Sequence, residues 1–210
     1  MPTKSITQRI FPFVSLDMPD NTSSEGSADM PYAVPNILVE HTPLTLPVPV
    51  GFWRSVGHSY NAFFPECFMD ELAHAAGKDP YAYRRELLDG HADYLAVLDR
   101  AAQEAEWGGN LGPGRGKGIA LHESFGSIVA QVAEITMLDE TAVQVDRVVC
   151  VVDCGRVINP DTVVAQIQSG VIYGLTAALF GEITLKDGAV EQSNFPDYAM
   201  LRLGQAPLIE

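Results

Sequence analysis

The spacing of hydrophobic and polar positions changes along this chain, and the changes predict its elements. Between residues 64 and 107 apolar side chains recur at helical spacing, and Gly77 is expected to end the first helix. Asp79 followed by Pro80 is typical of an N-cap and a first helical position, so a second helix begins there. An alanine-rich third helix is expected over about 92–106.

From residue 116 onward the spacing alternates instead. The stretches "GKGIALHES", "SIVAQVAEITML" and "AVQVDRVVCVVDCG" predict three strands, the last two joined as an antiparallel hairpin through "DET". A helix is expected after Pro160, and a short hairpin around Asp187-Gly188. The expected apolar stripe of that helix is Val163, Val164, Ile167, Val171, Leu175 and Ala178. The tail ends on what is expected to be the start of another strand.

These patterns predict an α+β fold with an antiparallel or mixed sheet and helices packed on it. Residues 1–50 carry more than half of the fourteen prolines and are expected to form a loop-rich, extended segment. Residues 51–112 are expected to be a helical segment, and residues 113–210 a sheet-plus-helix segment. Together they are expected to form one part of a larger subunit.

Composition narrows the functional class. The chain has 210 residues, of which 47% are hydrophobic and 19% charged, as in ordinary globular proteins. Its formal net charge of −14 argues against nucleic-acid binding, which requires a basic face. No apolar run is expected to reach the roughly 18 residues of a membrane span, and no secretory signal is expected at the N-terminus. The sequence therefore leaves the compartment open.

Candidate chemistry is concentrated in "WRSVGHSYN", residues 53–61. Three interpretations fit these residue types. The polar side chains could cap the following helix and satisfy buried backbone groups. Ser55 or Ser59 with His58 could form a hydrolase site, although no G-x-S-x-G turn is present. The loop could instead bind an anion or cofactor, and "VDCGRVINP" at 152–160 repeats the same strand, loop and helix order.

The other candidate residues do not indicate a catalytic or metal-binding site. The three cysteines, Cys67, Cys150 and Cys154, lack metal-ligand spacing and are interpreted as small apolar residues. The five histidines are scattered, so a hydrolytic zinc site is not expected. Arg84 is expected on a helix flank. The carboxylates that could act as a general base, Glu66, Glu71 and Glu123, are interpreted as solvated.

Four stretches resemble one family in order and spacing. They are "GFWRSVGHSYNAFFPECFMDELAHAAGKDPYAYRRELL", "GRGKGIALHESFGSIVAQVAEI", "VDCGRVINPDTVVAQIQSGVIYGLTAALFGEI" and "NFPDYAMLRLGQAPLIE". Together they resemble the molybdopterin-binding subunit of the molybdenum hydroxylases, the xanthine dehydrogenase and aldehyde oxidase family. Within this family they resemble the branch that contains the isoquinoline 1-oxidoreductase β subunit and its aldehyde-oxidising relatives.

The resemblance implies a subunit that binds a molybdenum–pterin cytosine dinucleotide and hydroxylates N-heterocycles or aldehydes with oxygen from water. Electrons would leave through a small [2Fe–2S] subunit. The cofactor-facing loop of the family corresponds here to Trp53, Arg54, Ser55, Val56 and Gly57. The pterin-contacting "GQVEG" corresponds to "AQIQSG", which makes Gln166 the matching residue. Gln168 and Ser169 depart from the family's glutamate and glycine.

The resemblance also implies that parts of the site lie elsewhere. The family's "GGxEMGQG" segment and its "VGE" loop with the catalytic glutamate are absent from these 210 residues. The chain by itself is therefore expected to be inactive, with no catalytic residue or metal ligand assigned to it. The remaining segments of the large subunit would complete it. The alternative is a non-catalytic remnant that serves as a binding or scaffold module.

Overall fold

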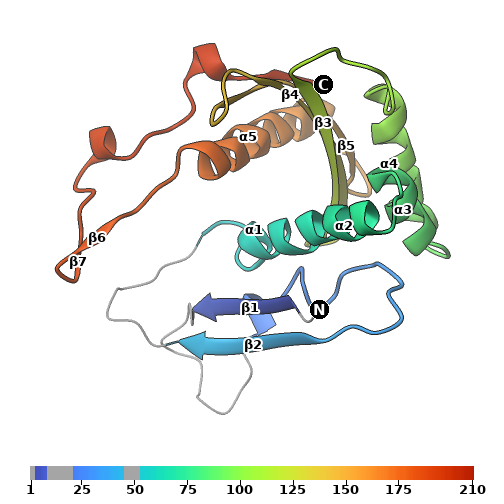
Figure 1. Cartoon of the computed structure of the whole chain (residues 1–210), viewed down its shortest axis with the longest axis horizontal. Helices are drawn as coiled ribbons and strands as arrows, with labels where there is room; N and C mark the ends of the chain where they lie inside the picture. The colour runs from blue at the N-terminus through green and yellow to red at the C-terminus, as the bar shows by residue number, and fades with distance from the viewer. Residues whose placement is uncertain (1–2, 9–20, 45–52) are drawn as a thin grey trace. The chain divides into compact units, whose positions relative to one another are not determined.

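The computed structural model describes residues 3–8, 21–44 and 53–210 (Figure 1). The boundary expected at residue 50 lies outside the described residues. The chain divides into two compact units. The first unit is Met1–Ala96 with Leu121–Ile128, and the second is Val97–Ala120 with Val129–Glu210.

The N-terminal part contains a strand pair that the sequence did not predict. Strand β1 (Thr3–Gln8) pairs in parallel with β2 (Val39–Leu44), with Thr3 opposite Val39. Before β2 lies a 3₁₀ turn, η1 (Asn21–Ser23), which leads into a tight turn through residue 29. Part of the segment expected to be loop-rich therefore has ordered local structure.

The predicted helices are confirmed, and their ends follow from local sequence. Helix α2 (Phe63–Ala75) is followed by Gly77 at a φ of 64°, the left-handed value that ends a helix most readily in glycine. Helix α3 (Pro80–Leu87) begins with the Asp79 side chain accepting the Ala82 N–H. Helix α4 spans Ala92–Glu104. A four-residue helix, α1 (His58–Asn61), precedes α2 and was not predicted.

The three predicted strands form one mixed sheet. Strands β3 (Arg115–Ser124), β4 (Ser127–Met137) and β5 (Val143–Asp153) are neighbours in that order. Their short connections are typical of antiparallel hairpins, and Leu138 N donates to Ala142 O at the second one. The tail adds β8 (Leu208–Ile209) in parallel to β5, so the strand expected at the end of the chain is present. The fold is α+β, as predicted.

Helix α5 (Pro160–Leu179) packs one face against this sheet. Figure 1 shows it running along the strands of the second unit. The contact contains Val145, Val148 and Val171, with Ala133, Ile135, Ile167, Leu175 and Ile209 around them. The predicted stripe is therefore correct at its centre, but Val164 and Ala178 are exposed, because the buried face is narrower than the apolar pattern. Within the described residues, α5 is the one helix long and apolar enough to cross a membrane, a test that core helices also pass.

The remaining tail returns to the end of α5. The predicted hairpin is formed by β6 (Leu185–Lys186) and β7 (Ala189–Val190), with Asp187 and Gly188 both at positive φ. Two 3₁₀ turns follow, η2 (Phe195–Asp197) and η3 (Leu203–Gln205). Leu201 N donates to the Thr176 hydroxyl at 3.3 Å, which ties the tail to α5.

Candidate functional site

The loop at residues 53–57, here called the site loop, forms a strained turn. Val56 N donates to Trp53 O at 3.1 Å and closes the turn. Val56 itself has a φ of 49°, a left-handed value that its branched side chain disfavours. Such a conformation costs on the order of 1–3 kcal/mol and persists only where surrounding contacts hold it. Strain of this kind is concentrated at functional loops.

Contacts on the inner side of the site loop hold it in place. They come from residues 22–29, here called the supporting segment. Gly57 N donates to Glu25 Oε1 at 3.2 Å, and the Asn61 side chain donates to Ser23 O at 2.9 Å and to Glu25 O at 2.8 Å. Asn61 is fully buried. The first interpretation of the polar cluster is therefore correct for Asn61, which satisfies backbone carbonyls.

Two histidines extend these contacts to the sheet. His58 Nδ1 lies 2.9 Å from His122 Nε2 on β3, and His58 Nε2 lies 3.9 Å from Glu25 Oε2. At such a distance one imidazole must donate and the other accept, so the two facing nitrogens share a single proton. Gly26 lies against both rings, because a Cβ there would come within 3.0 Å of each.

This pairing contradicts the hydrolase interpretation. The hydroxyl oxygens of Ser55 and Ser59 lie 2.6 Å apart and form a hydrogen bond with each other. Both ring nitrogens of His58 face other partners, so His58 is not placed as a general base for either serine. The serines are therefore part of the loop structure.

The histidine pair should make the free energy of unfolding depend on pH. Burial lowers the pKa of His122 below its ordinary value of 6.5, and His58 adds to this effect, while Asp29 and Glu123 oppose it. Because the folded state binds the proton less readily, this contribution to stability is complete above pH 6.5 and is lost as the pH falls below it. We expect the free energy of unfolding in urea to fall between about pH 7.5 and about pH 5.5.

His122→Gln should reduce that fall, because it removes the titrating group and keeps a hydrogen-bonding side chain for His58. His74→Gln, on the exposed side of α2, is the matched control and should keep the wild-type dependence. An unchanged dependence in His122→Gln would contradict the assignment.

A buried ionic network lies near the site loop in the first unit. Arg84 on α3 is fully buried, and Glu66 on α2 is 7% exposed. Arg84 Nε donates to Glu66 Oε2 at 2.9 Å, and its other nitrogens donate to Asp70 and to backbone carbonyls. Glu66 also accepts the Tyr32 hydroxyl at 2.7 Å and the Leu121 N–H at 2.8 Å. The network thus joins two helices, a strand and the segment after residue 29.

This network corrects two predictions. Glu66 is not solvated, and Arg84 does not lie on an exposed flank. Burial raises the pKa of the Glu66 carboxyl, whereas Arg84, the Leu121 N–H and the Tyr32 hydroxyl act in the opposite direction. Burial also opposes the charge on Arg84, but Glu66, Tyr32 and Asp70 together outweigh it and raise the pKa of the guanidinium. Helical spacing alone failed here because each charged side chain is compensated by a partner distant in sequence.

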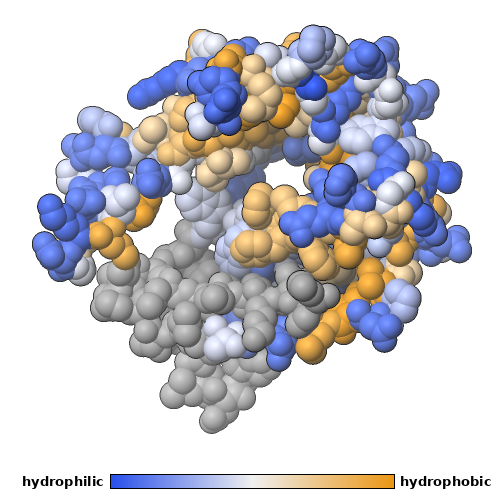
Figure 2. Space-filling view, in the orientation of Figure 1, coloured by the Kyte–Doolittle hydropathy of each residue, from blue (hydrophilic) through white to orange (hydrophobic). Residues whose placement is uncertain are grey.

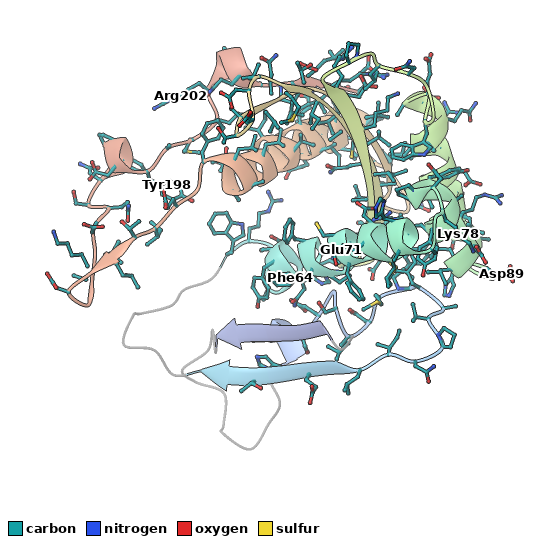
Figure 3. All side chains as sticks on the ribbon, viewed as in Figure 1. Phe64, Glu71, Lys78, Asp89, Tyr198 and Arg202 are labelled. Atoms are coloured by element: carbon teal, nitrogen blue, oxygen red, sulfur yellow. The ribbon has the colours of Figure 1, made fainter. Side chains whose placement is uncertain are left out.

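The outer side of the site loop is exposed to solvent. Trp53 is 51% exposed and Arg54 is exposed, while Ser55 and Val56 are half-buried and Gly57 is buried. Phe63 and Phe64 at the start of α2 are also exposed and meet edge to face, and Figure 3 labels Phe64 there. The site loop therefore presents an aromatic ring and a guanidinium outward.

The other predicted positions lie in the second unit. Gln166 is an exposed residue of α5, in the second turn of that helix. The "VDCGRVINP" stretch ends as expected, with the Asn159 side chain accepting the Thr162 N–H at 3.1 Å to begin α5. The five loop residues thus belong to one unit and Gln166 to the other.

Sequence reasoning missed the supporting segment, Glu25 above all. Its residues, "TSSEGSAD", have the composition of a solvent-exposed loop. Two signals were present: serines compact enough for burial, and a glycine between polar residues. Ser23 and Ser27 are buried, and Gly26 has a φ of 84°.

Comparison with known proteins places the chain in a family. Residues 69–207 match the molybdopterin cofactor-binding domain. The isoquinoline 1-oxidoreductase β subunit of Brevundimonas diminuta is 34% identical over 166 residues, 77% of this chain and 21% of that protein. A nicotinate dehydrogenase subunit of Pseudomonas putida is 29% identical over 199 residues, 86% of this chain and 17% of that protein. A membrane-bound aldehyde dehydrogenase [pyrroloquinoline-quinone] of Gluconacetobacter polyoxogenes is 28% identical over 178 residues, 75% of this chain and 23% of that protein.

The fold and the matched residues define a cofactor-binding domain. The chain belongs to the molybdopterin cofactor-binding domain family, and the resemblance inferred from its motifs is confirmed. It spans about a fifth of the length of these curated relatives.

The exposed groups of the site loop suit an anionic cofactor. An arginine provides planar donors that match phosphate oxygens, and Arg54 is exposed beside an exposed indole. The hydrogen bonds at Gly57 and Asn61 hold the backbone of the loop, and the exposed side chains project from that backbone.

Proposed function

We propose that this chain is part of the molybdopterin-binding subunit of an oxidoreductase that hydroxylates N-heterocycles or aldehydes with oxygen from water. The cofactor would be the molybdenum–pterin cytosine dinucleotide, and a small [2Fe–2S] subunit would accept the electrons. The names of the relatives support these substrate classes, since they include isoquinoline, nicotinate and aldehyde. The observation that carries the proposal is the site loop, which is held on its inner side and presents Trp53 and Arg54 outward.

In this proposal the residues of the chain bind and orient the cofactor. When bound, the molybdenum–pterin group supplies the oxygen-transfer and redox chemistry. Arg54 would pair with the anionic pyrophosphate, and the Trp53 ring would cover an apolar part of the ligand. Gln166, with an amide that both donates and accepts, would contact the pterin.

The surface of α5 supports completion by further protein. Along its length it exposes Val164, Tyr173 and Leu179. Figure 2 shows apolar residues at the surface along this helix. Exposed apolar residues that lie together can form a protein–protein contact. We assign this contact to the remaining segments of the large subunit, because the relatives are about four to six times as long as the matched region.

The test is the molybdenum content of an Arg54→Ala variant. The subunit is completed with the segments that the relatives carry, expressed in a host that makes the cofactor, and measured by mass spectrometry. A hydrogen bond to a charged group contributes about 1.5–3 kcal/mol, so cofactor retention should fall roughly 10- to 100-fold.

Arg100→Ala is the control, because Arg100 is an exposed arginine in a surface pair with Glu104, 2.7 Å away. It should retain the wild-type molybdenum content. Equal retention in both variants would exclude the proposed role of Arg54. A completed wild-type subunit without molybdenum would favour the alternative, a non-catalytic binding or scaffold module.

A further inference from the structure

The supporting segment first approaches the site loop through its backbone. Gly57 is the closest point: a Cβ built there would lie 2.1 Å from Thr22 O and 3.0 Å from Glu25 Cγ. No side chain fits in that space, so the two chain segments meet backbone to backbone. The contact fixes the distance between residues 22 and 57.

Glu25 adds a second connection of a different kind. Its Oε1 accepts the Gly57 N–H at 3.2 Å, and its Oε2 lies 3.9 Å from His58 Nε2. One carboxylate therefore contacts both the end of the site loop and the first residue of α1. Because the Gly57 N–H precedes the first turn of α1, no backbone carbonyl of that helix can accept it.

Asn61 makes the third connection from the other end of α1. Two hydrogen bonds of its side chain go to carbonyl oxygens of the supporting segment, those of Ser23 and Glu25. The segment is itself folded, since Ala28 N donates to Ser24 O at 3.0 Å and Gly26 N donates to Asp29 Oδ1 at 2.6 Å. A folded turn transmits its position to the loop more rigidly than a flexible strand would.

These contacts converge on the strained residue. Val56, at a φ of 49°, immediately precedes Gly57, where the supporting segment makes its closest contact. A valine relaxes to negative φ when its neighbours allow it, and the turn that presents Trp53 and Arg54 would then be lost. We propose that residues 22–29 position the site loop for its cofactor, with Glu25 and Asn61 as positioning residues. This inference rests on the proposed function.

The first test measures the loop in the 210-residue chain. Hydrogen exchange at the Gly57 amide should become about tenfold faster in Glu25→Ala, because the acceptor of that amide is removed. Glu25→Gln keeps an oxygen acceptor at the same position, so it should restore slow exchange. Glu71→Ala is the control, since Glu71 is an exposed glutamate on α2 and is labelled in Figure 3. Exchange at the buried Met69 and Ala73 of α2, in the same unit as Glu25, and at Leu98 and Ala101 of α4 in the other unit monitors global unfolding.

If Glu25→Ala unfolds the chain, Glu25→Asp provides the milder change, because it shortens the carboxylate by one methylene. It should accelerate exchange at Gly57 and leave α4 unchanged. Unchanged exchange at Gly57 in a folded Glu25→Ala or Glu25→Asp variant would overturn the inference.

The second test measures molybdenum retention in the completed subunit. Glu25→Ala should lose molybdenum while Glu25→Gln retains it, in parallel with the exchange rates. Arg54→Ala serves as the reference. Loss in Arg54→Ala with full retention in Glu25→Ala would overturn the positioning role and leave the proposed function standing. Full retention in both would overturn the proposed function and the positioning role together.

Discussion

Replacing Arg84 with alanine should destabilise the chain by about 3–5 kcal/mol, because it leaves the buried Glu66 carboxylate without its cation. Arg84 is fully buried and donates to Glu66, Asp70 and two backbone carbonyls. A loss of this size is a large part of the 5–15 kcal/mol that typically stabilises a folded domain. The measurement is the midpoint of urea unfolding, monitored by circular dichroism.

Arg85→Ala is the matched control, since Arg85 is the next residue on α3 and is exposed. It should change the free energy of unfolding by less than about 0.5 kcal/mol. The double variant Glu66→Gln with Arg84→Met should recover part of the loss, because it removes the unpaired buried charge and keeps an acceptor for the Tyr32 hydroxyl and the Leu121 N–H. An Arg84→Ala variant as stable as Arg85→Ala would show that the network contributes nothing.

The 210-residue chain purified by itself should show no steady turnover with aldehydes or N-heterocycles. A positioned general base contributes roughly 10²–10⁴-fold to such a reaction. The nearby carboxylates that the structure describes are engaged otherwise: Glu25 accepts the Gly57 N–H, and Glu66 pairs with Arg84. The chain also covers only about a fifth of the length of its relatives.

The assay is dye reduction after expression in a host that makes the cytosine dinucleotide cofactor, with molybdenum measured in the same sample. The completed subunit, assembled with its [2Fe–2S] partner, is the positive control. Stoichiometric molybdenum together with steady turnover in the 210-residue chain would contradict the prediction.

Local signals in the sequence predicted most of the secondary structure. Asp79-Pro80 begins α3, Asn159-Pro160 begins α5, and Asp187-Gly188 turns the last hairpin. Each of these signals acts over a few residues, so one sequence is enough to recognise it. Alternation likewise predicted the strands of the mixed sheet, because one side of a half-buried strand is apolar.

The sequence was less informative where partners are far apart along the chain. Glu66 and Arg84 are 18 residues apart, and Asn61 reaches carbonyls 36 and 38 residues away. A charged residue on a helix has the same local pattern whether it is solvated or paired in the interior. The site loop was found by resemblance, but its division into a held inner side and an exposed outer side depends on these distant contacts.

The close approach between Thr22 and Gly57 restricts the side chain at position 57 but not the one at position 22. Thr22 takes part through its carbonyl oxygen, so the contact itself is indifferent to the side chain at position 22. At position 57 any side chain would displace that carbonyl. Substitutions of the exposed Trp53 and Phe64 leave this contact intact. The glycine should stay invariant, because the outer residues inherit their orientation from it.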